Sequence, residues 1–395
     1  MLIFTLYLSA NAIAFVQGVS DGGMLLDGSF FELDQVSLFF SFITICGVLF
    51  SFLFVFKFFD KSIIEKNKIV LRWKYGITLV ILQVSFLIFN SVMGLNVAGG
   101  DSRPENGSLL NYFFMLLQPD ILFMLTALFL ASERLFFINL LVFLLSMFLR
   151  GWMGGVFIVI NIAMIRYYPI RLSMKTCLSI VFSVVIVFLL LPAIIDAKWA
   201  MRLGISVSDF INSLSDSFTL EKYNNAIGYV INRFQHVGHV ALLLENSAQV
   251  YKDFENGIFI GYWMDGLPQH TLAKILSFDT YKINSYMVTH LYNIPDAIWN
   301  TNPGISGWIL ILGSEVLFMI LYLLLIMVFP FWFVQKYAGK RMLMLMSFFS
   351  LIYLFHGWFG AYFNIAFYAV LVVVFYRLRC KPIAIPLASI NKVTS

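Results

Sequence analysis

The stretch Val36–Phe56, VSLFFSFITICGVLFSFLFVF, decides the class of this protein. It holds no charged residue, and about 20 consecutive apolar residues are enough for a helix to cross the hydrocarbon core of a bilayer. The next segment, KFFDKSIIEKNKIVLRWK (57–74), contains six lysine and arginine residues. Because such basic clusters gather in cytoplasmic loops, the two segments predict a membrane-spanning helix that ends on the cytoplasmic side.

The composition of the whole chain supports the same class. Of its 395 residues 61% are hydrophobic and 12% are charged, with a mean hydropathy of +0.87. Soluble domains carry roughly 25% charged residues, so a water-soluble globular protein is excluded. The three cysteines (46, 177 and 380) lie outside the long polar segment described below, and no phosphate loop or dinucleotide fingerprint is present. We therefore expect no cofactor, no cysteine-based metal site and no nucleic-acid partner.

Apolar runs recur along the chain and predict about ten membrane spans. Their residues are 1–17, 36–56, 76–95, 109–130, 135–149, 152–165, 178–195, 305–329, 342–355 and 362–376. Pro119-Asp120 interrupts the fourth run. The first run also allows a signal peptide cleaved near Ala10-Asn11-Ala12, but it lacks a basic residue before its apolar core, which favours a retained helix. Lysine and arginine concentrate in alternate connections, so both termini are predicted to be cytoplasmic.

The chain divides into three parts on this basis. Residues 1–195 form an N-terminal transmembrane bundle of about seven spans, and 305–395 form about three spans with a short cytoplasmic tail. Between them, 196–304 form one large outer loop with amphipathic helical patterns over Ile205–Leu220 and Ala226–Tyr251. A connection of this length, rich in Tyr, Trp and His, is typical of a functional segment. The expected fold is an all-α polytopic membrane protein.

The segment Val230–Asn246, VINRFQHVGHVALLLEN, is the strongest candidate for chemistry. Its apolar residues follow one stripe of a predicted helix, and Arg233, His236 and His239 form a second stripe along its edge. A neutral imidazole can accept a proton from a sugar hydroxyl, and a guanidinium can bind phosphate. The alternative is a helix that lies on the membrane with its polar edge in water. No HExxH pattern completes a metal site, so none is expected.

Arginines are unusual in loops outside the cytoplasm, and four are predicted there: Arg103, Arg150, Arg202 and Arg233. Guanidinium groups bind pyrophosphate oxygens with paired hydrogen bonds, and a lipid pyrophosphate at the membrane surface would need them. The alternative is that each arginine reaches lipid headgroups or pairs with a carboxylate. Arg150 is followed by glycines that admit a ligand or another helix close to the backbone.

Several further polar residues stand in apolar surroundings. His356 occupies a very short outer turn between two spans, and His290 and Asn300 lie in the long loop. Each is a candidate site residue, with a structural hydrogen-bonding role as the alternative. Asp120 and Glu315 are carboxylates inside predicted spans. They either pair with a buried cation or couple to protons, and the sequence leaves the choice open.

The layout resembles the O-antigen polymerase family of bacterial polysaccharide assembly. The resemblance rests on one large outer loop late among many spans, and on several local segments. These segments are Arg150-Gly151 at a span end, the Arg-led stretch Arg233 to Glu245, the aromatic segment Gly257–Gly261, and Asn302-Pro303-Gly304 leading to Gly307. It covers most of the chain. It implies a GT-C-like fold and a multi-pass protein of the bacterial inner membrane.

The resemblance also implies an activity. Such an enzyme is a glycosyltransferase that joins undecaprenyl-pyrophosphate-linked oligosaccharides into polysaccharide on the periplasmic side, in lipopolysaccharide biosynthesis. By analogy Arg150 and Arg233 bind the donor pyrophosphate, and His236 or His239 assists deprotonation of the acceptor. A chain-length regulator is a further candidate partner besides the bilayer. Two alternatives stay open: an O-antigen ligase that transfers glycan to lipid A–core, and a transporter or flippase of lipid-linked sugars.

Overall fold

The computed structural model describes residues 2–26, 29–61, 69–97, 109–152, 154–170, 173–205, 207–276, 281–295 and 301–379. The described part is almost wholly helical, and its strands are the two of a short hairpin. An all-α fold, as the sequence predicts, is therefore confirmed. The candidate residues Arg103 and Asn300 and the tail after Arg379 lie outside the described ranges.

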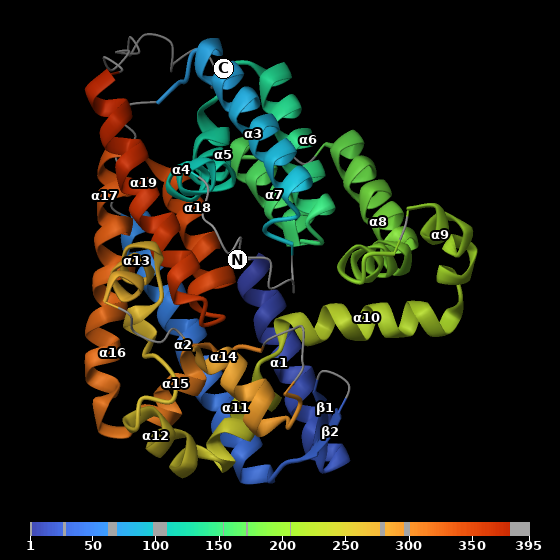
Figure 1. Cartoon of the computed structure of the whole chain (residues 1–395), viewed down its shortest axis with the longest axis vertical. Helices are drawn as coiled ribbons and strands as arrows, with labels where there is room; N and C mark the ends of the chain where they lie inside the picture. The colour runs from blue at the N-terminus through green and yellow to red at the C-terminus, as the bar shows by residue number, and fades with distance from the viewer. Residues whose placement is uncertain are drawn as a thin grey trace.

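The N-terminal half contains the longest uninterrupted helices (Figure 1). Its elements are α1 (Leu2–Asp21), β1 (Gly23–Leu26), β2 (Ser29–Glu32), α2 (Gln35–Lys61), α3 (Trp73–Met93), α4 (Leu109–Leu117), α5 (Pro119–Thr126), the 3-10 turn η1 (Ala127–Phe129), α6 (Glu133–Leu149), α7 (Gly154–Arg166) and α8 (Met174–Arg202). The predicted interruption at Pro119 is confirmed, because α4 ends before Gln118, whose φ is +42°.

The helices of the second half are shorter and more often interrupted. Its elements are α9 (Val207–Asn212), η2 (Leu214–Ser217), α10 (Leu220–Phe234), α11 (Val237–Glu245), α12 (Ser247–Glu255), η3 (Tyr262–Met264), α13 (Leu267–Ile275), α14 (Ile283–Tyr286), η4 (Met287–Leu291), α15 (Gly304–Leu312), η5 (Gly313–Glu315), α16 (Val316–Leu323), η6 (Leu324–Val328), α17 (Phe329–Ala338), α18 (Lys340–Phe349), η7 (Ser350–Leu354) and α19 (Phe359–Arg379). Three of the short elements, η4, η6 and η7, are π-helical. Gly313, with φ +51° and ψ −115°, bends the chain between α15 and α16.

Within the described ranges, seven helical segments are long and apolar enough to cross a membrane. They match seven of the ten predicted spans: Ile3–Asp21, Gln35–Lys61, Trp73–Met93, Leu109–Phe129, Val184–Met201, Gly304–Ala338 and Phe359–Leu378. The other three predicted spans are helical but shorter. α6 has 17 residues, α7 has 13, and α18 has 10 before it continues into η7. The protein is thus a helical membrane protein, with fewer full-length spans than the apolar runs predict.

The predicted boundary between residues 195 and 196 is wrong, because it falls inside α8. This helix continues to Arg202 although its last turns carry Asp196 and Lys198. Asp196 accepts hydrogen bonds from the Ser217 hydroxyl at 2.8 Å and from the Lys222 ammonium at 3.1 Å. Polar residues that pair with the following segment do not end a helix, and a composition shift cannot show that pairing. The boundary near residue 304 coincides with the first residue of α15.

Connections that are rich in basic residues meet at one end of the molecule. Lys340 pairs with Asp60 at 2.9 Å, which joins the start of α18 to the end of α2. Arg341 donates to the carbonyl of Tyr168 at 3.1 Å, and the guanidinium of Arg377 donates to the carbonyl of Tyr337 at 2.9 Å. The sequence assigns all of these connections to the same side of the membrane, and their contacts place them together.

The amphipathic helix α10 runs across the direction of α1, α2 and α17 (Figure 1). Among its residues only Ala226 is buried. It packs against α8 and α1, and α8 stands at the edge of the molecule. All seven residues of α8 from Val184 to Leu190 are exposed, so this part of α8 is apolar on every side. Such a helix is typical of a lipid-covered span, and α10 is typical of a helix in the membrane interface.

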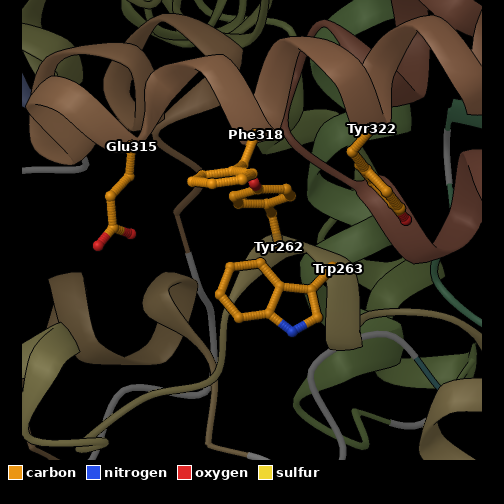
Figure 2. A pocket seen from close by; sticks show the side chains of 5 residues that line it. All are labelled: Tyr262, Trp263, Glu315, Phe318 and Tyr322. Atoms are coloured by element: carbon orange, nitrogen blue, oxygen red, sulfur yellow. The ribbon is translucent and has the colours of Figure 1, made fainter.

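A pocket of about 360 Å³ opens between η3 and α16 (Figure 2). Glu315, Phe318 and Tyr322 extend toward it from the η5–α16 segment, and Tyr262 and Trp263 face them from η3.

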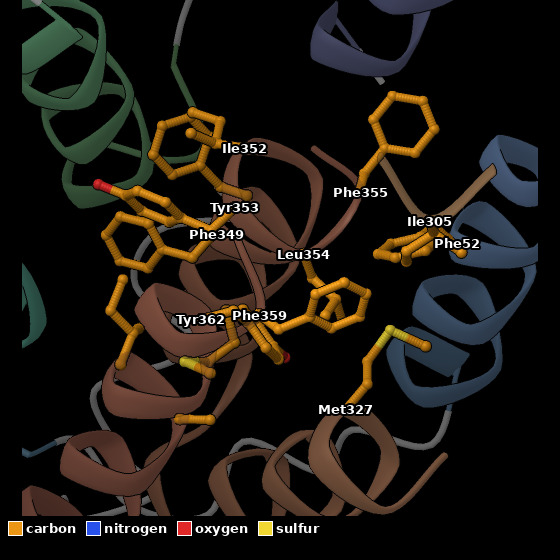
Figure 3. Packing of buried hydrophobic residues seen from close by; sticks show 14 of the residues in the cluster. Phe52, Ile305, Met327, Phe349, Ile352, Tyr353, Leu354, Phe355, Phe359 and Tyr362 are labelled. Atoms are coloured by element: carbon orange, nitrogen blue, oxygen red, sulfur yellow. The ribbon is translucent and has the colours of Figure 1, made fainter. Parts of the chain in front are cut away.

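The buried core lies where α2, α15, α18, η7 and α19 meet. Leu354, Phe355 and Phe359 flank the η7–α19 turn and pack with Phe52 of α2 and Ile305 of α15 (Figure 3). The backbone N–H of Ile305 donates to the carbonyl of Phe355 at 3.2 Å, so the turn and the start of α15 are joined directly. This core fixes the positions of the polar residues described next.

Candidate functional site

The helix predicted over Val230–Asn246 is broken in the structure. α10 ends at Phe234, Gln235 is extended with φ −91° and ψ 145°, and α11 starts two residues later. The side chain of Asn11 in α1 closes the break. Its amide donates to the carbonyl of Phe234 at 3.0 Å, and its oxygen accepts from the N–H of His236 at 2.7 Å. Buried backbone groups need such partners, so Asn11 stabilises the break.

The prediction that Arg233, His236 and His239 share the edge of one continuous helix is therefore wrong. Arg233 stays on α10 and is exposed, whereas His236 and His239 are 3% and 9% exposed on the α11 side. α11 does not lie on the membrane surface, because it packs into the core against α1, α2 and α15. The three residues nevertheless surround one ring, because the charges of Arg233 and His239 both act on His356 and His236 lies beside it.

His236 lies against His356, which the sequence offered only as a separate candidate. Their ring centroids are 4.3 Å apart, and the ring of Tyr7 contacts both histidines at 6.4 and 5.4 Å. Nε2 of His236 is buried and has no hydrogen-bond partner among the described residues. Buried polar atoms without a partner are rare, and this one is available to a ligand hydroxyl or a water.

Two glycines allow this close approach. A Cβ on Gly304 would lie 2.9 Å from Nδ1 of His236 and 3.1 Å from the carbonyl oxygen of Phe355. A Cβ on Gly357 would lie 3.1 Å from the Cα of Gly304. Both glycines have positive φ, +66° and +84°, a region that L side chains adopt only with strain. The start of α15 and the turn before α19 therefore touch through backbone alone.

Gly304→Ala is expected to lower the thermal unfolding temperature of the detergent-solubilised protein more than Gly94→Ala does. Gly94 is a matched control, since its φ is +61° and a Cβ there would meet nothing within 4 Å. Both variants incur the left-handed penalty of roughly 1–2 kcal/mol. Gly304→Ala adds overpacking against His236, which typically costs about 1–3 kcal/mol. Equal unfolding temperatures for the two variants would contradict the contact with His236.

His239 has a hydrogen-bonded environment of its own. Its Nδ1 lies 2.5 Å from the hydroxyl of Tyr292 and 3.4 Å from the hydroxyl of Thr301. The adjacent Asn302 has a buried amide oxygen without a hydrogen-bond partner in the described part of the chain. His239 is thus held by its neighbours, and its role is better described as positioning than as direct contact with a substrate.

Two cations share one phenol oxygen beside this cluster. The ammonium of Lys198, on α8, and Nε of Arg233, on α10, both donate to the hydroxyl oxygen of Tyr229, the latter at 3.0 Å. Both cations also lie over the Tyr229 ring, at 4.4 and 4.9 Å from its centroid. Lys198 is 4% exposed. The two cations thus converge on one aromatic residue, and phosphate oxygens are anions that both groups can bind.

The electrostatics of the cluster keep the histidines neutral. Burial lowers the pKa of His236 well below its ordinary value, and His356 and His239 lower it further. Burial, with the charge of Arg233 and then His239, lowers the pKa of His356 to about 3. At neutral pH both rings are therefore uncharged. An anion that neutralises Arg233 would remove the second of the causes that lower the pKa of His356, after burial, and would make this ring a better proton acceptor.

Acidification is expected to destabilise the fold. The unfolded chain binds protons at these histidines below the ordinary pKa of 6.5, whereas the folded cluster resists protonation until a much lower pH. Stability is thus fully present above 6.5 and is lost as the pH falls from 6.5 toward about 3. We expect the thermal unfolding temperature in detergent to fall over this window, with a flatter slope for His356→Gln. The control His290→Gln, outside the cluster, should keep the wild-type slope, and identical slopes in all three proteins would contradict this origin.

Arg150, predicted to bind pyrophosphate, is buried in an ion pair. It is 7% exposed and donates to a carboxylate oxygen of Asp120 at 2.5 Å and to the carbonyl of Ser146 at 3.0 Å. Its guanidinium also lies 5.2 Å from the ring centroid of Phe86. This is the structural alternative that the sequence left open for both Arg150 and Asp120. The pair lies apart from the histidine cluster in the contacts observed here.

The other candidates are dispersed. Arg202 is the last residue of α8, four residues after Lys198. His290 stacks on Tyr286 with centroids 4.5 Å apart, and its Nδ1 lies 2.8 Å from the hydroxyl of Thr289. Glu315 lines the pocket beside η3. Within the described ranges, no group of three or more His, Cys, Asp or Glu side chains could hold a metal ion.

The site thus consists of a dibasic pair, Lys198 and Arg233, beside His236, His239 and His356. Chemically it can bind an anion and accept a proton next to it. Sequence reasoning missed Lys198, Tyr229 and Asn11. Lys198 carried a signal, a cation close after an apolar run on the outer side, but only arginines were weighed there. Tyr229 and Asn11 are ordinary residues until the fold brings α1, α8 and α10 together.

Comparisons with known proteins identify no relative. No family model matches the chain, and no curated protein and no solved structure matches it. The function is therefore argued from the site alone.

Proposed function

We propose that this protein is a membrane glycosyltransferase that polymerises polyprenyl-pyrophosphate-linked oligosaccharide repeat units into an O-antigen-type polysaccharide. The observation that carries the proposal is the pairing of Lys198 and Arg233 around one phenol oxygen, beside three histidines. A pyrophosphate would bind both cations in exchange for the Tyr229 hydroxyl. The donor in this scheme is the growing chain on undecaprenyl pyrophosphate, and the acceptor is a new lipid-linked repeat unit.

The reaction uses the two halves of the site in different ways. A hydroxyl oxygen of the acceptor sugar bonds to the anomeric carbon of the donor, and the bond from that carbon to the pyrophosphate oxygen breaks. Negative charge grows on the leaving pyrophosphate, where Lys198 and Arg233 stabilise it. The hydroxyl proton passes to a neutral imidazole. No nucleotide and no redox partner is needed for this balance.

His356 is the histidine best placed to accept the proton. It is partly exposed, whereas His236 and His239 are buried. The charge of Arg233 lowers the pKa of His356, so the proposed base and a cation for the leaving group belong to the same site. His236 then supports the ring of His356 from behind and is a positioning residue. This differs from the assignment of His236 or His239 as the base that the resemblance implies.

The surroundings suit a lipid-linked donor. Lys198 lies near the end of α8, whose preceding turns are apolar and exposed on every side. A polyprenyl chain can lie along such a helix while its pyrophosphate reaches the cations at the end. α10, which carries Arg233, is amphipathic and packs against α8. We assign this end of α8 to the periplasmic face of a bacterial inner membrane, with both termini cytoplasmic, on the distribution of basic residues.

The rival functions have less support. A flippase or proton-coupled transporter would use intramembrane carboxylates, but Asp120 is paired with Arg150. An O-antigen ligase would use the same donor, and the site described here fits it as well. The polymerase is preferred because the long loop lacks the His-Asn pair expected of a ligase, with His290 followed by Leu291 and Tyr292.

The test is to delete the gene in its source cell and separate the cell-surface glycolipids on a gel. We expect a single-repeat band in the deletion strain and a ladder when the wild-type gene is restored. Absence of even the single repeat would indicate a ligase or a flippase. A normal ladder in the deletion strain would contradict every version of the proposal.

A further inference from the structure

The pocket between η3 and α16 is separate from the dibasic site and has a different chemistry. Its walls are the aromatic rings of Tyr262, Trp263, Phe318 and Tyr322, and its charged group is Glu315 (Figure 2). Its volume of about 360 Å³ lies within the range of small-molecule sites, roughly 300–1,000 Å³. Aromatic walls with a few polar groups are the usual composition of such sites.

The aromatic rings are held at fixed angles. Tyr262 and Trp263 meet edge to face, with centroids 4.9 Å apart and planes at 90°. Tyr262 also lies 5.4 Å from Tyr322 across the pocket. The indole of Trp263 folds over Gly261, where a Cβ would come within 2.6 Å of the ring. The pocket therefore presents preformed aromatic surface. Trp263 is 42% exposed and is accessible to a ligand.

Two polar groups in the pocket have capacity for a ligand. The hydroxyl of Tyr322 is buried and has no hydrogen-bond partner among the described residues. The carboxylate of Glu315 accepts one long hydrogen bond, from the hydroxyl of Tyr251 at 3.4 Å. A carboxylate offers about four lone-pair positions, so several remain. A ligand that supplies hydroxyl groups would meet both needs.

We propose that this pocket binds a sugar ring of a glycan. The apolar C–H face of a pyranose stacks on the exposed indole of Trp263, and its hydroxyls donate to Glu315 and exchange a hydrogen bond with Tyr322. A quaternary ammonium would suit the aromatic rings and the carboxylate. It has no N–H or O–H group, however, and would leave the Tyr322 hydroxyl without a partner. The assignment of this sugar to the acceptor chain, and only that assignment, rests on the proposed function.

The pocket is adjacent in the fold to the histidine cluster. Tyr262 packs against Phe359 with ring centroids 5.6 Å apart, and Phe359 follows His356 by three residues. A glycan bound in the pocket is therefore held beside the turn that carries the proposed base. Lys198 and Arg233 lie on α8 and α10, which do not line the pocket.

The test is saturation-transfer-difference NMR on the purified full chain in lipid nanodiscs. The probes are glucose, galactose, rhamnose and N-acetylglucosamine, with tetramethylammonium as competitor. We expect ring C–H signals from at least one sugar, reduced several-fold by Trp263→Ala and by Glu315→Gln. Trp332→Ala is the matched control, because Trp332 is 43% exposed and lies on α17 outside the pocket. Gly261→Ala displaces the indole without removing it, and serves if Trp263→Ala does not fold.

The outcomes separate this proposal from the function proposed above. No sugar signal, a signal that survives both Trp263→Ala and Gly261→Ala, or displacement by tetramethylammonium overturns the saccharide site. If the sugar signal depends on Trp263 but deletion of the gene leaves the ladder intact, the saccharide site is supported and the proposed polymerase function is contradicted. Lys198→Ala should keep the sugar signal while it abolishes the ladder, and loss of both would overturn the separation of the two sites.

Discussion

Lys198→Ala and Arg233→Ala are each expected to reduce polymerisation by about 100-fold or more. Removing one preorganised group that stabilises charge in the transition state typically costs 10²–10³ in rate. Each variant leaves the pyrophosphate with one cation where the native site provides two. The glycolipid of the complemented deletion strain should consist of the single-repeat band with little ladder. Arg233→Lys should also lose much of the ladder, because an ammonium does not form the paired hydrogen bonds of a guanidinium.

Lys222→Ala is the matched control for these variants. Lys222 lies on the same helix as Arg233, but it pairs with Asp196 at 3.1 Å and is partly exposed. Its removal deletes an ion pair near the surface that is worth about 0–1 kcal/mol, so the ladder should be retained. A normal ladder with Lys198→Ala and Arg233→Ala, at equal protein levels, would contradict the dibasic site. Loss of the ladder in all three variants would indicate a general effect of charge on the fold.

Asp120→Leu is expected to destabilise the protein by about 3–5 kcal/mol, the usual cost of leaving a buried cation without its partner. The guanidinium of Arg150 contacts a carboxylate oxygen of Asp120 at 2.5 Å inside the helical bundle. The loss should be measurable as a lower unfolding temperature in detergent. Replacing both residues, in Asp120→Leu with Arg150→Met, should recover most of the stability, since an apolar pair of similar volume is often neutral or stabilising.

The double variant also decides the role of Arg150. We expect it to retain the glycan ladder, because the carboxylate of Asp120 already neutralises the guanidinium. A stable double variant without a ladder would contradict this and support pyrophosphate binding by Arg150, as the resemblance implies. A double variant as unstable as Asp120→Leu would contradict the description of the pair as an isolated unit.

Much of the fold follows from the sequence because long apolar runs have few alternatives in a lipid environment. Seven predicted spans correspond to helices of sufficient length, and the break at Pro119 is where the missing N–H of proline requires it. The extent of α8 was not predictable, since the polar residues of its last turns find partners farther along the chain, as Asp196 does in Ser217 and Lys222. Local composition reports a polar residue and does not report its partner.

The site was predictable only in part. The sequence selected Arg233, His236, His239 and His356, and the fold brings them together. The reason for selecting them was incorrect, because the predicted continuous helix is interrupted where Asn11 binds both sides of the break. Hydrophobic periodicity contains no information about a side chain more than two hundred residues away. The second cation, Lys198, becomes meaningful only when α8 and α10 meet at Tyr229.

The most direct test of the central claim is reconstitution of the purified protein in liposomes with an undecaprenyl-pyrophosphate-linked oligosaccharide as sole substrate, followed by mass spectrometry of the lipids. The account predicts a lipid that carries two repeat units, together with an equal amount of free undecaprenyl pyrophosphate. Arg233→Ala should give neither product, and Lys222→Ala should give both. Recovery of the substrate chemically unchanged, whether in its original leaflet or moved to the other one, would contradict the account.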